Sequence, residues 1–133
     1  MILIDTGAFL ARYIAQDQFH AQSLRLWDRL EKRGGRFFTS NFILNETLTL
    51  LARRVGYEFA AEKAQIFFSS TALSILRPSE EEESMAIHFF RKYADQEVSF
   101  TDCLSFALMR RKNIEEVFSF DRHFEIAGFK ILK

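Results

Sequence analysis

Short apolar runs alternate with longer amphipathic stretches along this chain. The first run, Ile2 to Ile4, is uniformly apolar, which is typical of a strand buried on both faces. It stops at Asp5, and the apolar residues that follow are compatible with a helix. The pattern therefore predicts that Asp5 lies where a buried strand ends and a helix begins. In open α/β sheets, ligands bind at this edge.

The rest of the chain repeats the alternation of strands and helices. Helical spacing, caps and chain breakers predict helices over about 7–15, 19–33, 41–56, 57–70, 79–93 and 99–112, with a helical turn over 121–127. Predicted strands cover 2–4, 36–39, 72–76, 117–120 and 129–132. This order indicates crossover connections and a parallel sheet, so we expect an α/β fold with residues 1–133 as a single domain.

Four carboxylates are predicted to lie towards the carboxyl edge of this sheet. Asp5 and Asp121 each follow a predicted strand, and Asp102 lies in the first turn of a helix. Glu46 lies about two turns into the helix after the second strand, among apolar neighbours. Each has an ordinary explanation when taken alone, as a helix cap, as a complement to the helix dipole or as a solvent-facing side chain. Their placement on one edge favours a shared site.

Clustered carboxylates raise one another's pKa values unless a cation lies among them. Their hard oxygen atoms suit Mg²⁺ or Mn²⁺. The only cysteine is Cys103, and His20, His88 and His123 lie on separate predicted elements, which argues against a zinc site. Of these histidines, His123 alone is close enough to one of the four acids to merit a test.

Composition narrows the class of protein further. The 18 basic and 18 acidic residues cancel, so nucleic-acid binding would rest on local clusters. A single cysteine excludes an intrachain disulfide and, without a signal-peptide pattern, favours a cytoplasmic location. No apolar run approaches the length that spans a membrane. The acidic run Glu80–Glu83 is predicted to be a solvated first helical turn.

Four segments, in this order, resemble the PIN-domain family, the fold of the VapC-type ribonuclease toxins. They are ILIDTGAFL at the start, TSNFILNETLTLL around Glu46, VSFTDCLSFALMRR around Asp102 and VFSFDRHF around Asp121. The resemblance implies a three-layer α/β/α fold around a mainly parallel sheet of roughly five strands. It also implies an acidic metal site and endoribonuclease activity on RNA, with a 5′-phosphate and a 3′-hydroxyl on the products.

The resemblance assigns metal coordination most firmly to Asp5 and Asp102. Glu46 and Asp121 complete the acidic pocket, and all four acids are expected to be catalytic. The cofactor implied is Mg²⁺ or Mn²⁺, which activates a water molecule for in-line attack on the phosphorus.

Residues close to the acids are expected to assist them. In PIN-domain proteins, the positions of Thr6 and Ser119 can support the pocket through hydrogen bonds. Arg12 and Arg122 follow the first and the last of the acids closely, so they are candidates for contacts with RNA phosphates.

The predicted helix pair over 40–70 carries more apolar residues than one packing face needs. By resemblance, it serves homodimer formation and the docking of an antitoxin. We therefore expect the ribonuclease toxin of a type II toxin–antitoxin pair. A noncatalytic PIN-like module that binds RNA or protein is the alternative. A phosphotransfer domain that uses Asp5 is less favoured, because the chain lacks a glycine-rich phosphate loop.

Overall fold

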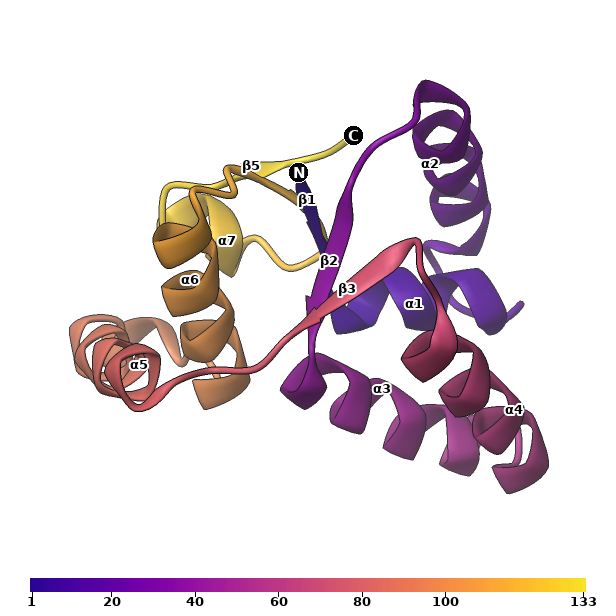
Figure 1. Ribbon diagram of the computed structural model, residues 1–133, viewed down its shortest axis with the longest axis horizontal. Helices are drawn as coiled ribbons and strands as arrows, with labels where there is room; N and C mark the ends of the chain where they lie inside the picture. The colour runs from indigo at the N-terminus through magenta and orange to yellow at the C-terminus, as the bar shows by residue number, and fades with distance from the viewer.

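Five parallel strands form the centre of the computed structural model, which describes residues 1–133 (Figure 1). They are β1 (Ile2–Ile4), β2 (Phe37–Ser40), β3 (Leu73–Leu76), β4 (Glu116–Phe118) and β5 (Lys130–Ile131). Their order in the sheet is β3-β2-β1-β4-β5, and every neighbouring pair is parallel. The first strand of the chain is therefore the middle strand of the sheet, which agrees with its uniformly apolar sequence.

Helices cover both faces of this sheet (Figure 1). The first group is α1 (Thr6–Tyr13), α2 (His20–Arg33), α3 (Asn41–Arg54) and α4 (Tyr57–Ser69). The second group, on the other side in Figure 1, is α5 (Glu80–Lys92), α6 (Phe100–Lys112) and the short α7 (His123–Ile126), with the 3₁₀ turn η1 (Ala94–Gln96) between α5 and α6. The predicted three-layer α/β/α fold is confirmed. No helix has the length and apolar character needed to cross a bilayer.

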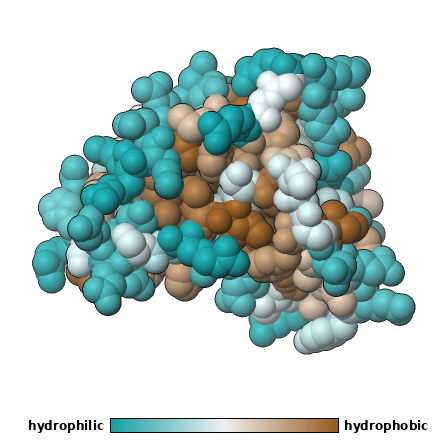
Figure 2. Space-filling view, in the orientation of Figure 1, coloured by the Kyte–Doolittle hydropathy of each residue, from teal (hydrophilic) through white to brown (hydrophobic).

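Aromatic rings dominate the core beneath α5, α6 and α7. The fully buried ring of Phe106 meets Phe124 edge-on at 5.2 Å between centroids, and Phe89 edge-on at 6.0 Å. Such edge-to-face pairs add to the stabilisation that burial of apolar surface supplies. Figure 2 shows apolar side chains in the middle of one face of the molecule, with hydrophilic residues around its margin.

The acidic run Glu80–Glu83 at the start of α5 is exposed as predicted at every position except one. The Ser79 hydroxyl accepts a hydrogen bond from the Glu82 N–H at 3.3 Å, and the Glu82 carboxylate accepts one from the Ser79 N–H at 3.0 Å. This capping box buries Glu82, while Glu80, Glu81 and Glu83 are exposed. The prediction of a solvated turn is therefore wrong for Glu82 alone.

Strand β4 also ends two residues earlier than predicted, at Phe118. The Ser119 hydroxyl accepts a hydrogen bond from the Asp121 N–H at 3.0 Å, which closes a turn directly after the strand. Ser119, Phe120 and Asp121 therefore lie beyond the carboxyl edge of the sheet.

Candidate active site

Asp5 is held at the carboxyl edge of β1 by both its backbone and its side chain. Its N–H donates to the Phe118 carbonyl at 3.0 Å, which extends the pairing of β1 with β4. Asp5 occupies the N-cap position of α1, yet its carboxylate makes no capping hydrogen bond. Instead, Oδ2 accepts a 2.7 Å hydrogen bond from the buried Ser119 hydroxyl. The ordinary interpretation of Asp5 as a helix cap therefore does not describe its side chain.

Asp102 is positioned by the first turn of α6. The Ser99 hydroxyl caps this helix by accepting a hydrogen bond from the Asp102 N–H at 3.1 Å. The residues from Cys103 to Met109 that follow are all buried, so α6 is enclosed by the rest of the protein. The Asp102 carboxylate is consequently presented from a rigid element, and the residue is only 8% exposed.

Asp121 and His123 stand beside Asp102. The Asp121 carboxylate accepts a hydrogen bond from the His123 N–H at 2.9 Å, which fixes the turn before α7. The His123 Nδ1 atom lies 3.1 Å from Asp121 Oδ1 and 3.7 Å from Asp102 Oδ2. One possible ligand atom from each of these three residues lies within 4.8 Å of the others. The structure thus adds an imidazole to the predicted set of acids.

All four predicted acids line one hollow of about 490 Å³. Glu46 reaches it from the exposed side of α3, so it faces solvent, as its ordinary interpretation predicted, and still lines the hollow. No lysine or arginine lines the hollow. Its ionisable lining residues, apart from a single histidine, are the carboxylic acids Asp5, Asp17, Glu46, Glu97, Asp102 and Asp121.

This concentration of acids raises the pKa values of the two most enclosed members. Burial raises the pKa of Asp5 from 3.8 to about 6, although the hydrogen bond from Ser119 opposes the rise. Burial also raises the pKa of Asp102 from 3.8 to about 8, and the neighbouring charges of Asp5, Asp121 and Glu46 act in the same direction. No lysine or arginine lines the hollow to offset these negative charges, and a divalent cation among the acids would favour their charged forms.

A second observation also fits a cation. The Thr6 side chain lines the same hollow, and its Oγ1 atom is buried without a hydrogen-bond partner. A buried hydroxyl without a partner costs free energy unless water or an ion satisfies it. The donor set of hydroxyl and carboxylate oxygen atoms matches the preference of Mg²⁺ and Mn²⁺. Of the two predicted supporting residues, Ser119 contacts an acid directly and Thr6 offers a free oxygen.

The two predicted phosphate-binding arginines do not line the hollow. Arg12 lies in α1, where its guanidinium is 3.3 Å from the Glu31 carboxylate and 4.6 Å from the centre of the Trp27 ring. It therefore takes part in the packing of α1 against α2. Arg122 is exposed, next to Asp121. Contact of either arginine with RNA phosphate stays a prediction.

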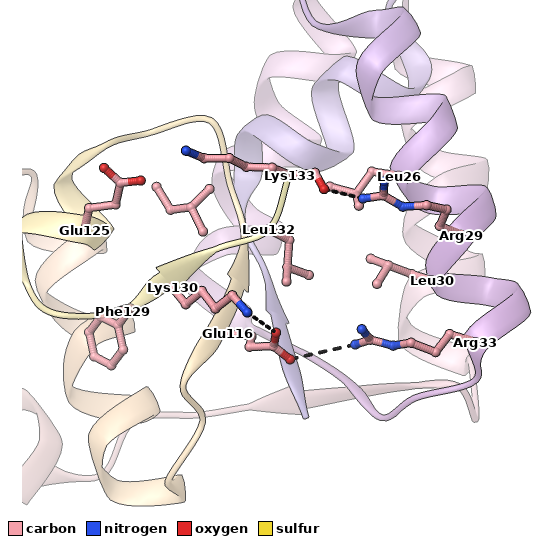
Figure 3. Close-up of a pocket in the computed structure, with 11 residues that line it drawn as sticks. Leu26, Arg29, Leu30, Arg33, Glu116, Glu125, Phe129, Lys130, Leu132 and Lys133 are labelled. Carbon is pink, nitrogen blue, oxygen red and sulfur yellow. Dashed lines mark hydrogen bonds and ion pairs between the residues drawn. The ribbon is translucent and has the colours of Figure 1, made fainter.

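A larger hollow, of about 770 Å³, lies beside the first residues of β4 and β5 (Figure 3). It mixes basic and acidic side chains, and Glu116 has two basic partners. Glu116 lies 3.7 Å from Arg33 and 3.8 Å from Lys130, and Arg29 donates a hydrogen bond to the carbonyl of Lys133. None of the predicted site residues lines it. The concentration of acids without a lysine or arginine, and not the size of the cavity, therefore identifies the candidate active site.

Two aromatic residues in the wall of the acidic hollow were not predicted from the sequence. Phe19 precedes α2 and Phe120 follows β4, and their rings are parallel to within 4° with centroids 4.4 Å apart. Phe120 lies within the segment VFSFDRHF but Phe19 lies in none of the four segments, and the pair forms only where the α1–α2 loop meets the end of β4. A contact between such distant segments leaves no periodic signal in the sequence.

Several known proteins are similar to this chain in sequence and in fold. The PIN domain family matches residues 2–130. The 23S rRNA-specific endonuclease VapC20 of Mycobacterium tuberculosis is 36% identical over 129 residues, which are 97% of this chain and 95% of that protein. A VapC ribonuclease of Archaeoglobus fulgidus is 32% identical over 127 residues, or 93% of this chain and 79% of that protein.

Solved structures agree with the sequence matches. The crystal structure of VapC20 from Mycobacterium tuberculosis, a toxin that cleaves the sarcin–ricin loop, has a TM-score of 0.88 at 35% identity and covers 97% of this chain and 96% of its own. FitAcB from Neisseria gonorrhoeae has the same fold, with a TM-score of 0.73 at 18% identity over 100% of this chain and 97% of its own. These matches confirm the resemblance that was noted in the four segments around the acids. The chain belongs to the PIN-domain family.

Proposed function

We propose that this protein is a Mg²⁺- or Mn²⁺-dependent endoribonuclease and that residues 1–133 form the single domain that carries the activity. One observation supports this most directly: Asp5, Glu46, Asp102 and Asp121 line one hollow that contains no lysine or arginine. The similarity to VapC20 and to the ribonuclease of Archaeoglobus fulgidus supports RNA as the substrate class.

In this proposal, the acids have distinct positions and roles. Asp5 and Asp102 are the most buried of the four, and they would hold the cation from the residue after β1 and from the first turn of α6. Glu46, on the exposed side, and Asp121 hold a second cation or orient the attacking water. Ser119 keeps the Asp5 carboxylate in place, and the free hydroxyl of Thr6 faces the same hollow.

The bound cation supplies a Lewis acid that lowers the pKa of water and neutralises charge on the phosphate. The protein's contribution is to keep several negative oxygen atoms at fixed positions in a partly enclosed hollow. No side chain needs to form a covalent bond with the substrate.

The partners proposed for this protein are a second copy of the chain and a cognate antitoxin, in the cytoplasm. Helices α3 and α4 expose several large apolar side chains, among them Tyr57, Ile66 and Phe68, which are 76%, 53% and 52% exposed. Exposed apolar side chains that lie together mark sites of protein–protein contact. This surface lies on the helix pair over residues 40–70, which the family resemblance assigned to homodimer formation and to the docking of an antitoxin.

The central test is cleavage of single-stranded RNA by the purified protein with Mn²⁺ and again with EDTA. We expect cleavage with Mn²⁺ only, and its loss in Asp5→Asn and Asp102→Asn. Asp28→Asn is the matched control, because Asp28 is an exposed acid on α2 that pairs only with Lys32. Circular dichroism checks that each variant is folded. Equal cleavage by the wild type and both site variants would reject the proposed site.

The alternative, a noncatalytic RNA- or protein-binding module, predicts a different result in the same assay. The protein would retain RNA in a filter-binding measurement but leave it intact at every Mn²⁺ concentration.

A further inference from the structure

The acidic hollow has an uncharged side that the proposed catalytic roles do not use. Its apolar lining residues are two aliphatic side chains, Leu10 and Leu50, and the two phenyl rings of Phe19 and Phe120. The rings are stacked, with centroids 4.4 Å apart and planes within 4°. Phe19 is only partly buried, and Phe120 is its only aromatic partner.

The position of the ring pair relative to the acids is fixed on the side of β4. Phe120 stands between Ser119, which donates to Asp5, and Asp121, which belongs to the acidic cluster. Its ring also packs edge-on against the fully buried Phe118, with centroids 6.0 Å apart. Movement of Phe120 would therefore disturb both the core and the acids.

The position of Phe19 is fixed on the side of the α1–α2 loop. The Asp17 carboxylate accepts a hydrogen bond from the Phe19 N–H at 2.8 Å, which holds the turn before α2. His20 Nδ1 lies 2.7 Å from the Ala11 carbonyl oxygen, and the Ser23 hydroxyl donates to the Ala8 carbonyl at 3.2 Å. These contacts tie the start of α2 to α1 and hold the backbone of Phe19, while its ring rests on Phe120.

An RNA strand that places a phosphodiester among the acids needs a surface for its adjoining bases. The carboxylates around the hollow can neither attract the phosphates nor stack with a base. Unpaired bases stack on aromatic side chains in proteins that bind single-stranded RNA, and this stacking tolerates different bases because each has a π face. Phe19 and Phe120 carry the only phenyl rings that line this hollow together with the acids.

We propose that Phe19, supported from below by Phe120, is a stacking platform for one unpaired nucleobase next to the phosphodiester that is cut. This inference rests on the proposed ribonuclease function and adds a positioning residue to it. Phe120 stacks on Phe19 and packs edge-on against the buried Phe118, so this series of ring contacts ties the proposed platform to the core of the protein.

The test pairs a change in the protein with a change in the RNA. Single-turnover cleavage is measured for a short single-stranded RNA and for a series in which one nucleotide at a time is abasic. For the wild type, we expect an abasic nucleotide at one position beside the cut to lower kcat/KM by about 5- to 100-fold. Phe19→Leu should lower kcat/KM on intact RNA by a similar factor and should no longer respond to the abasic nucleotide at that position.

Two variants serve as controls. Phe19→Tyr keeps the π face and should cleave within about threefold of the wild type, since the stacking surface is retained. Phe59→Leu removes another partly buried ring that has a single close aromatic partner, Tyr13, and lies outside the hollow, so it should leave the abasic pattern unchanged. Thermal melts show whether each variant is folded.

The inference is overturned if Phe19→Leu cleaves every RNA in the series with the wild-type pattern, or if Phe59→Leu reproduces the effect of Phe19→Leu. A binding measurement separates this result from failure of the proposed function. An RNA that carries 2-aminopurine beside the cut should lose fluorescence on binding to Asp102→Asn, and the added Phe19→Leu change should restore the fluorescence. Unchanged quenching in that double variant also rejects the platform, whereas absence of cleavage by the wild type with Mn²⁺ rejects the nuclease activity itself.

Discussion

The Ser119 hydroxyl donates a 2.7 Å hydrogen bond to the Asp5 carboxylate, although 114 positions separate the two residues in the chain. The same oxygen accepts a hydrogen bond from the Asp121 N–H at 3.0 Å. One buried serine therefore connects the end of β1 with the turn after β4 and orients two acids of the candidate active site.

Replacement of Ser119 by alanine should weaken metal binding and cleavage while the fold is retained. The variant loses the hydrogen bond that opposes the rise in the pKa of Asp5, so protons compete better with the metal. Loss of an orienting hydrogen bond of this kind typically costs about 10- to 100-fold in metal affinity or activity. Calorimetric titration with Mn²⁺ measures the affinity.

Ser105→Ala is the matched control for this change. Ser105 is also buried, but its hydroxyl donates to the Thr101 carbonyl within α6 and does not contact an acid. Its metal affinity should stay within about twofold of the wild type, because the oxygen atoms around the metal keep their positions. An equal loss in both variants would show that general packing, and not the bond to Asp5, is responsible.

The metal-free protein should lose stability as the pH rises. The pKa values of Asp5 and Asp102, about 6 and about 8, both exceed the value of 3.8 expected in the unfolded chain. Between about pH 4 and pH 8 the folded state therefore binds more protons than the unfolded state, and the free energy of unfolding falls as the pH rises through this range. Urea denaturation in EDTA at several pH values measures this fall.

Two comparisons separate the acidic hollow from other causes of this pH dependence. Asp102→Asn should flatten the profile, because the amide carries no charge at any of these pH values. Saturating Mn²⁺ should stabilise the wild type at pH 8, by about 2.7 kcal/mol at one hundred times Kd. A profile that is the same in Asp102→Asn and the wild type would place the responsible groups elsewhere.

The two arginines next to the predicted acids should differ in their effect on RNA binding. Arg122 is exposed and is a candidate for contact with an RNA phosphate. If it makes this contact, Arg122→Gln should reduce the steepness of the plot of log affinity against log salt concentration by about 1. Arg12 is engaged by Glu31 and Trp27, so Arg12→Gln should leave this slope unchanged. Fluorescence anisotropy with labelled RNA over a range of salt concentrations distinguishes the two. An equal change in both slopes would show that Arg12 leaves Glu31 to reach the RNA.

The core prediction concerns Phe106, whose ring is fully buried and meets Phe89, Phe124 and Phe129. Phe106→Ala should lower the free energy of unfolding by about 3–5 kcal/mol, because the substitution leaves a cavity that the neighbouring rings fill only in part. Phe106→Leu should cost less, because it keeps most of the apolar volume. Equal losses in urea denaturation would contradict the cavity as the cause.

The positions of the strands along the chain and of the acids that follow them were accessible from sequence because both depend on local patterns, whereas the order of the strands in the sheet came from the structure. Ile2 to Ile4 forms an uninterrupted apolar run, and Asp5 marks its end, so the position of that acid follows from the strand boundary. The same reasoning found Asp121, even though β4 ends at Phe118 and not at Phe120 as predicted.

Side-chain environments were harder to predict because they depend on which face of a helix meets another element. Glu46 has apolar neighbours in the sequence yet is exposed, and Arg12 follows Asp5 closely yet turns toward Trp27. The approach of His123 to Asp102 and the stacking of Phe19 on Phe120 arise only from tertiary contacts. No spacing rule along the chain contains that information.

The central place of β1 has a consequence for synthesis on the ribosome. The first strand to emerge from the exit tunnel cannot gain its neighbour β4 until residues 116–118 have been made, and Asp121 follows later still. A nascent chain that stops short of this point holds Asp5 without Ser119, Asp121 or His123 beside it. A chain that stops before β4 therefore holds Asp5, Glu46 and Asp102 but lacks Asp121 and His123, so the acidic hollow is complete only after translation has passed residue 123.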